Sequence, residues 1–164
     1  YIYVVNNFDR IHVNQETKPL YDYCNCNNAR QLLLCLTDQP TSIILAQAAI
    51  ESGWGTSRFF LEGFNLFGIH AYNHNDDKIK ANNSSLVYVK KYNTISESIS
   101  HYLRTLARVS VYDEFREKRF ITQDVQIVNY LTKYSERREL YVNDIKDIIE
   151  YNQLCQYDTL KIHN

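Results

Sequence analysis

The chain has 164 residues, of which 45% are apolar, so it is long and hydrophobic enough for one folded domain with a real core. Its formal net charge of -1 argues against nucleic acid as the main partner, because a phosphate-binding surface usually shows an excess of basic residues. No apolar run approaches the roughly 20 residues of a membrane-spanning helix, so no span is expected. We expect a single domain over residues 1–164, and a monomer.

The four cysteines leave their pairing open. They are Cys24, Cys26, Cys35 and Cys155, and four cysteines allow three pairings. A bond between Cys24 and Cys26 would be strained, because one residue separates them. Disulfides in an oxidising compartment and buried free thiols are both favoured over a metal site, since no histidine stands at ligand spacing nearby. The chain has no methionine, even at position 1, so a removed signal peptide stays a hypothesis.

Helices dominate the predicted elements of the first half of the chain. Residues 1–27 form an N-terminal extension with little periodicity, in which Tyr1–Val5 is a candidate edge strand or a tail that packs against the domain. Residues 28–69 hold the core helices, predicted over Asn28–Leu36, Ser42–Ser52 and Thr56–Glu62. Pro40 precedes the second helix, so its N-cap is expected at Thr41 or Ser42, and Gly63 is expected to end the third.

A small β lobe is predicted over residues 70–92. Leu86–Tyr92 alternates apolar and polar residues as a strand does, and the polar stretch before it is rich in turn residues. We therefore expect a hairpin whose tip, Asn73–Asn83, is mobile.

The remaining residues, 93–164, predict C-terminal helices. Thr94 and Glu97 form a capping-box pattern at the start of a helix that runs to about Arg108. Further helices are predicted over Val111–Phe120, over Gln123–Thr132 with Thr122 as its cap, and from Ser135 to about Leu154.

The stretch Thr41–Ile69 holds all four glycines, the only tryptophan and an acidic residue in the last turn of a predicted apolar helix. That residue, Glu51, stands where the C-terminal end of the helix dipole disfavours negative charge. The dipole and the apolar surroundings are both expected to raise its pKa, as a general acid requires. The competing interpretation is a paired or surface carboxylate at a frayed helix end.

Trp54 stands three residues after Glu51 and lies between Gly53 and Gly55. A tryptophan beside a carboxyl, on a backbone that lets a ligand approach closely, is what a sugar-binding cleft needs. The chain also has 14 tyrosines, which mildly favour a carbohydrate cleft. Taken alone, a single tryptophan is more often a core anchor.

The segments LAQAAIESGWGTSR (Leu45–Arg58) and NLFG (Asn65–Gly68) resemble the glucosaminidase domain of bacterial cell-wall hydrolases, glycoside hydrolase family seventy-three, and its Bax-type branch in particular. The resemblance covers roughly Pro40 to Asn152. It continues through YNTISESI (from Tyr92), VYDEFR (from Val111), YSER (from Tyr134) and the pair Tyr141–Val142.

The resemblance implies a mainly α, lysozyme-like fold, in which a helical body and a small β-hairpin lobe flank a cleft. It implies an endo-β-N-acetylglucosaminidase that cleaves the β-1,4 bond between N-acetylglucosamine and N-acetylmuramic acid in peptidoglycan. Such an enzyme would be periplasmic, secreted or otherwise in the cell envelope, with peptidoglycan strands as its partner. No cofactor and no metal are expected, because the sequence has no glycine-rich phosphate loop and no spaced ligand set.

The resemblance also implies roles for individual residues. Glu51 takes the position of the catalytic acid, and Tyr134 falls on a tyrosine near that acid, where its hydroxyl would orient a water or the substrate. The expected substrate-binding residues are Gln47, Trp54, Asn65, Phe67 and Tyr72. Without the family, Tyr134 would read as an ordinary aromatic residue at the start of a helix.

The second carboxylate departs from the family pattern. Some relatives supply a glutamate from the β lobe, but residues 70–92 contain no glutamate and offer only Asp76 and Asp77. A solvated loop tip is the competing interpretation of this pair. Either one of these aspartates acts as the base, or the 2-acetamido group of the substrate assists while Glu51 alone moves protons.

Two other functions therefore stay open. The missing glutamate also suits a non-catalytic glycan-binding or wall-scaffolding domain. A lytic transglycosylase would share the fold and the acid but would leave an anhydro-muramic end.

Overall fold

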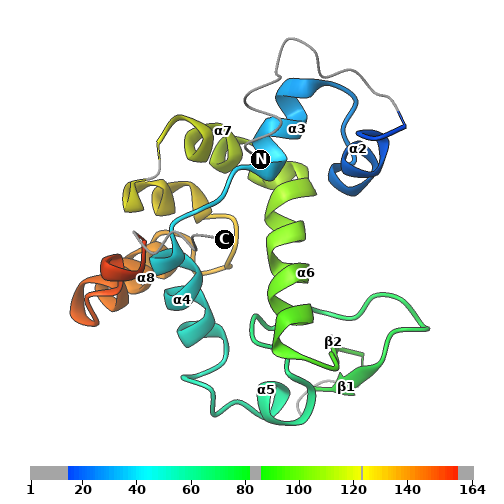
Figure 1. The fold of residues 1–164 in the computed structure, drawn as a ribbon. Helices are drawn as coiled ribbons and strands as arrows, with labels where there is room; N and C mark the ends of the chain where they lie inside the picture. The colour runs from blue at the N-terminus through cyan, green and yellow to red at the C-terminus, as the bar shows by residue number, and fades with distance from the viewer. Residues whose placement is uncertain (1–14, 82–85, 123, 159–164) are drawn as a thin grey trace. The chain divides into compact units, whose positions relative to one another are not determined.

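The computed structural model describes residues 15–81, 86–122 and 124–158, and the chain divides into two compact units. We call Tyr1–Ile43 with Arg104–Asn164 the terminal unit, and Ile44–Leu103 the central unit. Two helices, α4 (Thr41–Glu51) and α6 (Ile95–Arg108), each have residues in both units (Figure 1). The candidate edge strand at the N-terminus lies outside the described residues.

The terminal unit contains helices and no strand in the part that the structure describes. Its further elements are α2 (Lys18–Cys24), α3 (Ala29–Leu36), η2 (Ser110–Tyr112), α7 (Asp113–Ile121), η3 (Val125–Leu131), α8 (Glu139–Tyr151) and η4 (Leu154–Tyr157). Its buried residues include Leu32 on α3, Phe115 on α7 and Ile145 on α8. A disulfide between Cys24 and Cys35 ties α2 to α3, while Cys26 and Cys155 are free.

Local sequence signals explain part of this unit. Asn28 caps α3, because its side chain accepts a hydrogen bond from the Gln31 N–H at 2.9 Å, and the predicted helix is confirmed. Helix α2 was not expected. Its signal was Pro19 in the first turn, where a missing N–H costs nothing.

Two predicted boundaries in this unit are wrong. The helix expected over Gln123–Thr132 is the 3-10 helix η3, whose cap is Asp124 rather than Thr122, since Asp124 accepts from the Gln126 N–H at 2.7 Å. The helix expected from Ser135 begins at Glu139, because Arg138 just before it has a φ of 52° and breaks the helical path.

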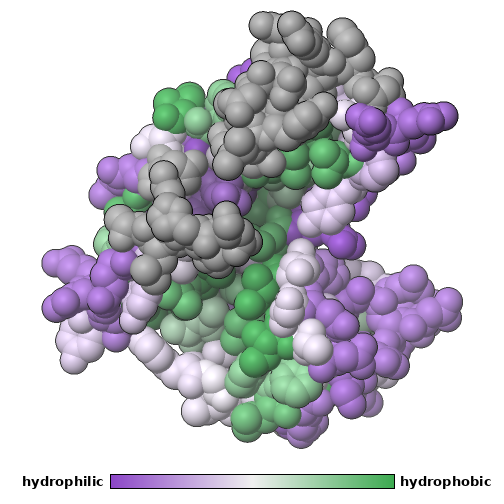
Figure 2. Space-filling view, in the orientation of Figure 1, coloured by the Kyte–Doolittle hydropathy of each residue, from purple (hydrophilic) through white to green (hydrophobic). Residues whose placement is uncertain are grey.

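The central unit contains α5 (Arg58–Gly63) and the two-stranded sheet. Strands β1 (Lys78–Lys80) and β2 (Tyr88–Lys90) pair antiparallel, with Ile79 opposite Val89. Figure 2 shows hydrophilic side chains gathered over this lobe. The predicted hairpin is confirmed, but its tip is not where it was expected, because β1 occupies part of Asn73–Asn83.

The capping box at the start of α6 is confirmed by its hydrogen bonds. Thr94 Oγ1 accepts from the Glu97 N–H at 3.1 Å, and the Glu97 carboxylate accepts from the Asn93 N–H at 2.8 Å. The helix then runs to Arg108 as expected, with Tyr102 and Leu106 buried.

The chain is thus mainly α with one small antiparallel sheet, as predicted. Among the described residues, no single helix is long and apolar enough to cross a bilayer. The bent pair of α3 and α4 reaches that length and composition only as two pieces.

Candidate active site

Glu51 is the last residue of α4 and is half-buried. Its carboxylate lies against the glycine of the NLFG segment: a Cβ added to Gly68 would come within 3.7 Å of Glu51 Oε2. Gly68 has a φ of +64°, a conformation that side chains rarely adopt. The chain therefore places the bare backbone of a loop beside the carboxylate.

The start of α4 is held by a residue far along the chain. The Ser42 N–H donates to Asp158 Oδ1 at 2.7 Å, and the Ser42 hydroxyl donates to Asp158 Oδ2 at 2.9 Å. The expected N-cap at Thr41 or Ser42 is therefore wrong, because both residues are already helical and the acceptor is a distant carboxylate.

A left-handed turn follows Glu51 directly. Gly53, Trp54 and Gly55 have φ values of 56°, 57° and 76°. The tryptophan at the centre of the turn is 63% exposed. Trp54 is therefore not a core anchor, and its indole is available to a ligand on this surface.

Three of the expected substrate-binding residues are buried in the central unit. Gln47 is 0% exposed and accepts a hydrogen bond from the Tyr102 hydroxyl at 2.5 Å, and Phe67 stacks on the Tyr102 ring with centroids 3.9 Å apart. Asn65 is 1% exposed, and its side chain donates to the Ile69 and Lys90 carbonyls and accepts from the Ile69 N–H. These contacts fix the loop that carries Gly68.

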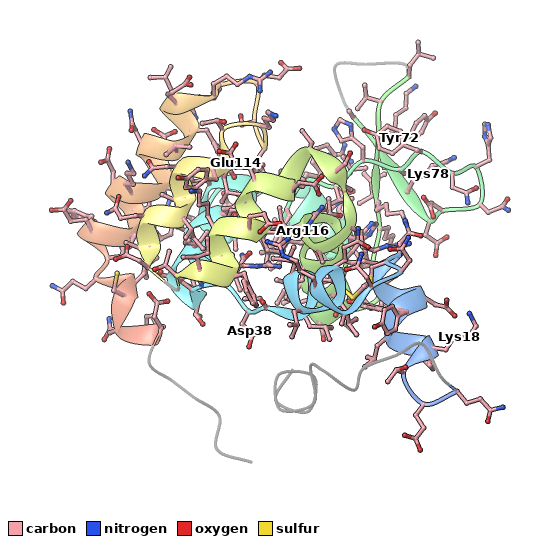
Figure 3. The ribbon with its side chains drawn as sticks, turned by 90° about the horizontal axis from the view of Figure 1, so that it is seen from above. Lys18, Asp38, Tyr72, Lys78, Glu114 and Arg116 are labelled. Atoms are coloured by element: carbon pink, nitrogen blue, oxygen red, sulfur yellow. A yellow bond between two sulfur atoms is a disulfide. The ribbon has the colours of Figure 1, made fainter. Side chains whose placement is uncertain are left out.

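The expected site residues of the β lobe are Tyr72, Asp76 and Asp77, and they differ in exposure. Tyr72 is 88% exposed and lies on the same lobe as Lys78 (Figure 3). Asp77 is exposed, whereas Asp76 is half-buried and forms an ion pair with Lys90 at 3.1 Å.

Sequence reasoning missed a polar network beside that ion pair. The Tyr92 hydroxyl lies 2.8 Å from His101 Nδ1, and burial together with the negative charge of Asp76 raises the pKa of Tyr92 well above its usual range. Tyr92 therefore stays a neutral hydroxyl. One weak indication of the contact between Tyr92 and His101 was present in the sequence: Tyr92 ends the predicted strand Leu86–Tyr92.

Tyr134 belongs to the terminal unit, in the turn before α8. Its ring stacks on that of Tyr141, with centroids 5.6 Å apart and planes 7° apart, and it lies 6.2 Å from the Tyr112 ring. Tyr141 is buried on α8, so this stack fixes the plane of the half-buried Tyr134 ring.

A pocket of about 340 Å³ also lies in the terminal unit, and none of the predicted site residues lines it. It is lined by Cys24, Cys26, Arg30, Glu117 and their neighbours. Arg30 forms a bidentate pair with Glu117, with Nη2 to Oε2 at 2.6 Å, and this hydrogen bond lowers the pKa of Glu117. Within the described ranges, no group of three or more His, Cys, Asp or Glu side chains is arranged to hold a metal ion.

Comparison with known proteins assigns the chain to a family. The family model described as mannosyl-glycoprotein endo-beta-N-acetylglucosaminidase matches residues 28–154. The chain belongs to the glucosaminidase family. The match includes the whole of the Glu51 motif and runs from α3 to α8.

Among curated proteins, this glucosaminidase domain is similar to protein Bax of Escherichia coli (strain K12). The two are 29% identical over 125 residues, which are 70% of this chain and 43% of Bax. The chain therefore spans less than half the length of that relative.

Three solved structures share the fold of the glucosaminidase domain. The catalytic domain of the autolysin Auto from Listeria monocytogenes has a TM-score of 0.60 at 19% identity, covering 93% of this chain and 94% of its own. An N-acetylmuramoyl-L-alanine amidase from Staphylococcus aureus has a TM-score of 0.61 at 19% identity, and the match covers 93% of this chain and 46% of the amidase chain. A peptidoglycan hydrolase from Sphingomonas sp. A1 has a TM-score of 0.57 at 20% identity, and the match covers 90% of this chain and 94% of the hydrolase chain. The predicted lysozyme-like fold is confirmed.

Proposed function

We propose that the domain is a peptidoglycan hydrolase, an endo-β-N-acetylglucosaminidase that cleaves the β-1,4 bond between N-acetylglucosamine and N-acetylmuramic acid. Membership of the glucosaminidase family supports a glycoside hydrolase. The names of two structural neighbours, an autolysin and a peptidoglycan hydrolase, support the cell wall as substrate. The enzyme would act outside the cytoplasm, where peptidoglycan lies, and as a monomer.

The single observation that carries the proposal is the setting of Glu51. A carboxylate at the end of a helix meets the bare backbone of Gly68 on one side and precedes a turn that exposes an indole. The glycine leaves room for a sugar ring, and the indole offers a stacking face for it.

In the proposed mechanism Glu51 donates a proton to the departing glycosidic oxygen. Trp54 and Tyr72 would stack on sugar rings, while Gln47, Asn65 and Phe67 would shape the loop around the reacting bond. Tyr134 would orient a water or the substrate.

The ion pair of Asp76 bears on which residue could act as the second catalytic group. Asp76 would have to leave its ion pair with Lys90 to act as a base, whereas Asp77 is exposed and forms no ion pair within the described part of the chain. A base requires a separation of about 6.5–9.5 Å from the acid, with a water between them. Assistance by the 2-acetamido group of the substrate needs neither aspartate.

The test is Glu51→Gln, which keeps the shape of the side chain and removes its proton. We expect turnover of isolated peptidoglycan to fall by about 10²- to 10⁴-fold, the usual contribution of a general acid, with the thermal unfolding midpoint close to that of the native domain. Glu62→Gln, an exposed glutamate on α5 paired with Arg58 at 3.1 Å, is the matched control and should retain activity. Near-native turnover by Glu51→Gln would refute the proposal.

Two further measurements separate the alternatives. A zymogram on purified cell walls should clear, whereas a scaffolding domain would bind the walls without clearing them. Mass spectrometry should find products with reducing ends, whereas a lytic transglycosylase would leave anhydro-muramic ends.

A further inference from the structure

Ser52 lies in the chain between the proposed acid and the exposed tryptophan. Its hydroxyl makes hydrogen bonds to backbone groups of α4 and of the turn that follows it. The residue is 2% exposed. Its hydroxyl donates to the Ala48 carbonyl at 2.6 Å and accepts from the Gly55 N–H at 2.9 Å. One oxygen atom therefore joins the last turn of α4 to the far end of the left-handed turn.

The turn needs such a tie because its backbone is costly. Trp54 has a φ of 57°, which a bulky residue adopts only when its surroundings enforce it. The backbone supplies part of that constraint, through the Trp54 N–H to the Ala49 carbonyl at 2.7 Å and the Ser57 N–H to the Ser52 carbonyl at 2.9 Å. Within the described residues, the Gly55 N–H has the Ser52 hydroxyl as its partner, so this bond fixes the chain just after the indole.

We infer that Ser52 is the positioning residue for Trp54: its hydroxyl holds the left-handed turn closed and so sets the indole as a preorganised platform for a sugar ring. The inference rests on the proposed function for its ligand, a glycan. It does not rest on it for the geometry, which can be tested in the free protein. A preformed platform lowers the ordering cost of binding, so the hydroxyl acts on substrate affinity through Trp54.

The chain offers a direct probe and a matched control. Trp54 is the only tryptophan, so all indole fluorescence reports on this turn. Ser57 makes the same type of bond in the next element, where its hydroxyl accepts from the Phe60 N–H at 3.2 Å as the cap of α5. Ser57→Ala therefore removes an equivalent bond without touching Gly55.

The first experiment measures the position of the indole without substrate. In Ser52→Ala we expect faster local motion of Trp54 in time-resolved anisotropy and a changed quenching constant with iodide, while Ser57→Ala matches the native protein. Ser52→Thr retains the hydroxyl and should restore the native anisotropy. Native mobility of the indole in a folded Ser52→Ala variant would overturn the inference.

A measurement on the native protein keeps the test open even when the variant does not fold. The Gly55 amide should exchange with solvent deuterium much more slowly than an unstructured peptide amide, because it is bonded to a buried oxygen. Exchange at the unstructured rate would overturn the inference.

The second experiment uses soluble glycan strands released from peptidoglycan. Ser52→Ala should raise KM by about 2- to 10-fold, the effect of one lost hydrogen bond, and leave kcat within about twofold. A fall in kcat with an unchanged KM would overturn the inference, because the hydroxyl would then act on the chemistry of Glu51. A native domain without any turnover would refute the proposed function instead, and the anisotropy result would still decide the role of Ser52.

Discussion

At the scale of single residues, Gly63 in the stretch Thr41–Ile69 is required for packing rather than for its backbone conformation. A Cβ added to Gly63 would lie 2.6 Å from Ile79 Cδ1 and 3.2 Å from Lys91 Cγ, so the bare Cα lets α5 approach the β lobe. The sequence suggested that Gly63 ends its helix. In the structure it is the last helical residue, and Phe64 takes the left-handed conformation, with a φ of 49°.

Gly63→Ala should therefore destabilise the domain by about 1–3 kcal/mol, the usual cost of overpacking, as measured by urea unfolding. In an Ile79→Val background, which removes the nearest carbon atom, the same substitution should cost less. If the two substitutions add without interaction, the contact with Ile79 is not the cause.

At the scale of elements, the start of α4 is capped by a residue from near the other end of the chain. Asp158 accepts from both the N–H and the hydroxyl of Ser42, and its charge complements the positive end of the helix dipole. Because Glu51 is the last residue of the same helix, this contact tethers the element that carries the proposed acid.

Asp158→Ala should lower the free energy of unfolding by about 1–2 kcal/mol, as the loss of a helix cap does. Asp158→Asn keeps one oxygen acceptor but loses the charge and the second acceptor, so it should cost less than Asp158→Ala. Chemical denaturation of the three proteins at equal ionic strength gives the comparison. Equal stability of Asp158→Ala and the native domain would show that α4 does not use this cap.

At the scale of the whole molecule, the disulfide between Cys24 and Cys35 cross-links two helices of the terminal unit. Cys24 and Cys35 are 11 residues apart in the chain, and both lie in a buried cluster with Tyr21 and Leu32. Closing such a loop lowers the conformational entropy of the unfolded chain, and the bond stabilises the fold largely through this effect.

Reduction of the Cys24–Cys35 bond should lower the free energy of unfolding by about 2–4 kcal/mol. The measurement is urea unfolding with and without a phosphine reductant, with the redox state checked by mass after alkylation. Cys155→Ser, at an exposed free thiol, should behave as the native domain under both conditions. An unchanged midpoint in fully reduced protein would contradict the prediction.

Much of the fold could be predicted because its signals are local. The cap at Asn28, the capping box at Thr94 and the alternation before Tyr92 each act within about four residues, so the sequence displays both partners together. The motif around Glu51 was equally visible, since its acid, its tryptophan and the two flanking glycines all fall within the short segment Glu51–Gly55. The start of α8 was missed because the φ of 52° at Arg138 has no signal in a charged stretch.

The sequence by itself determined the family, the helical class and the stretch that carries the candidate acid, because these depend on residue types at short spacing. Only the tertiary structure decided which cysteines pair, which carboxylate caps α4 and that Trp54 faces solvent. The partners in these contacts lie up to 116 residues apart, and which of them meet depends on how the whole chain closes rather than on any local preference.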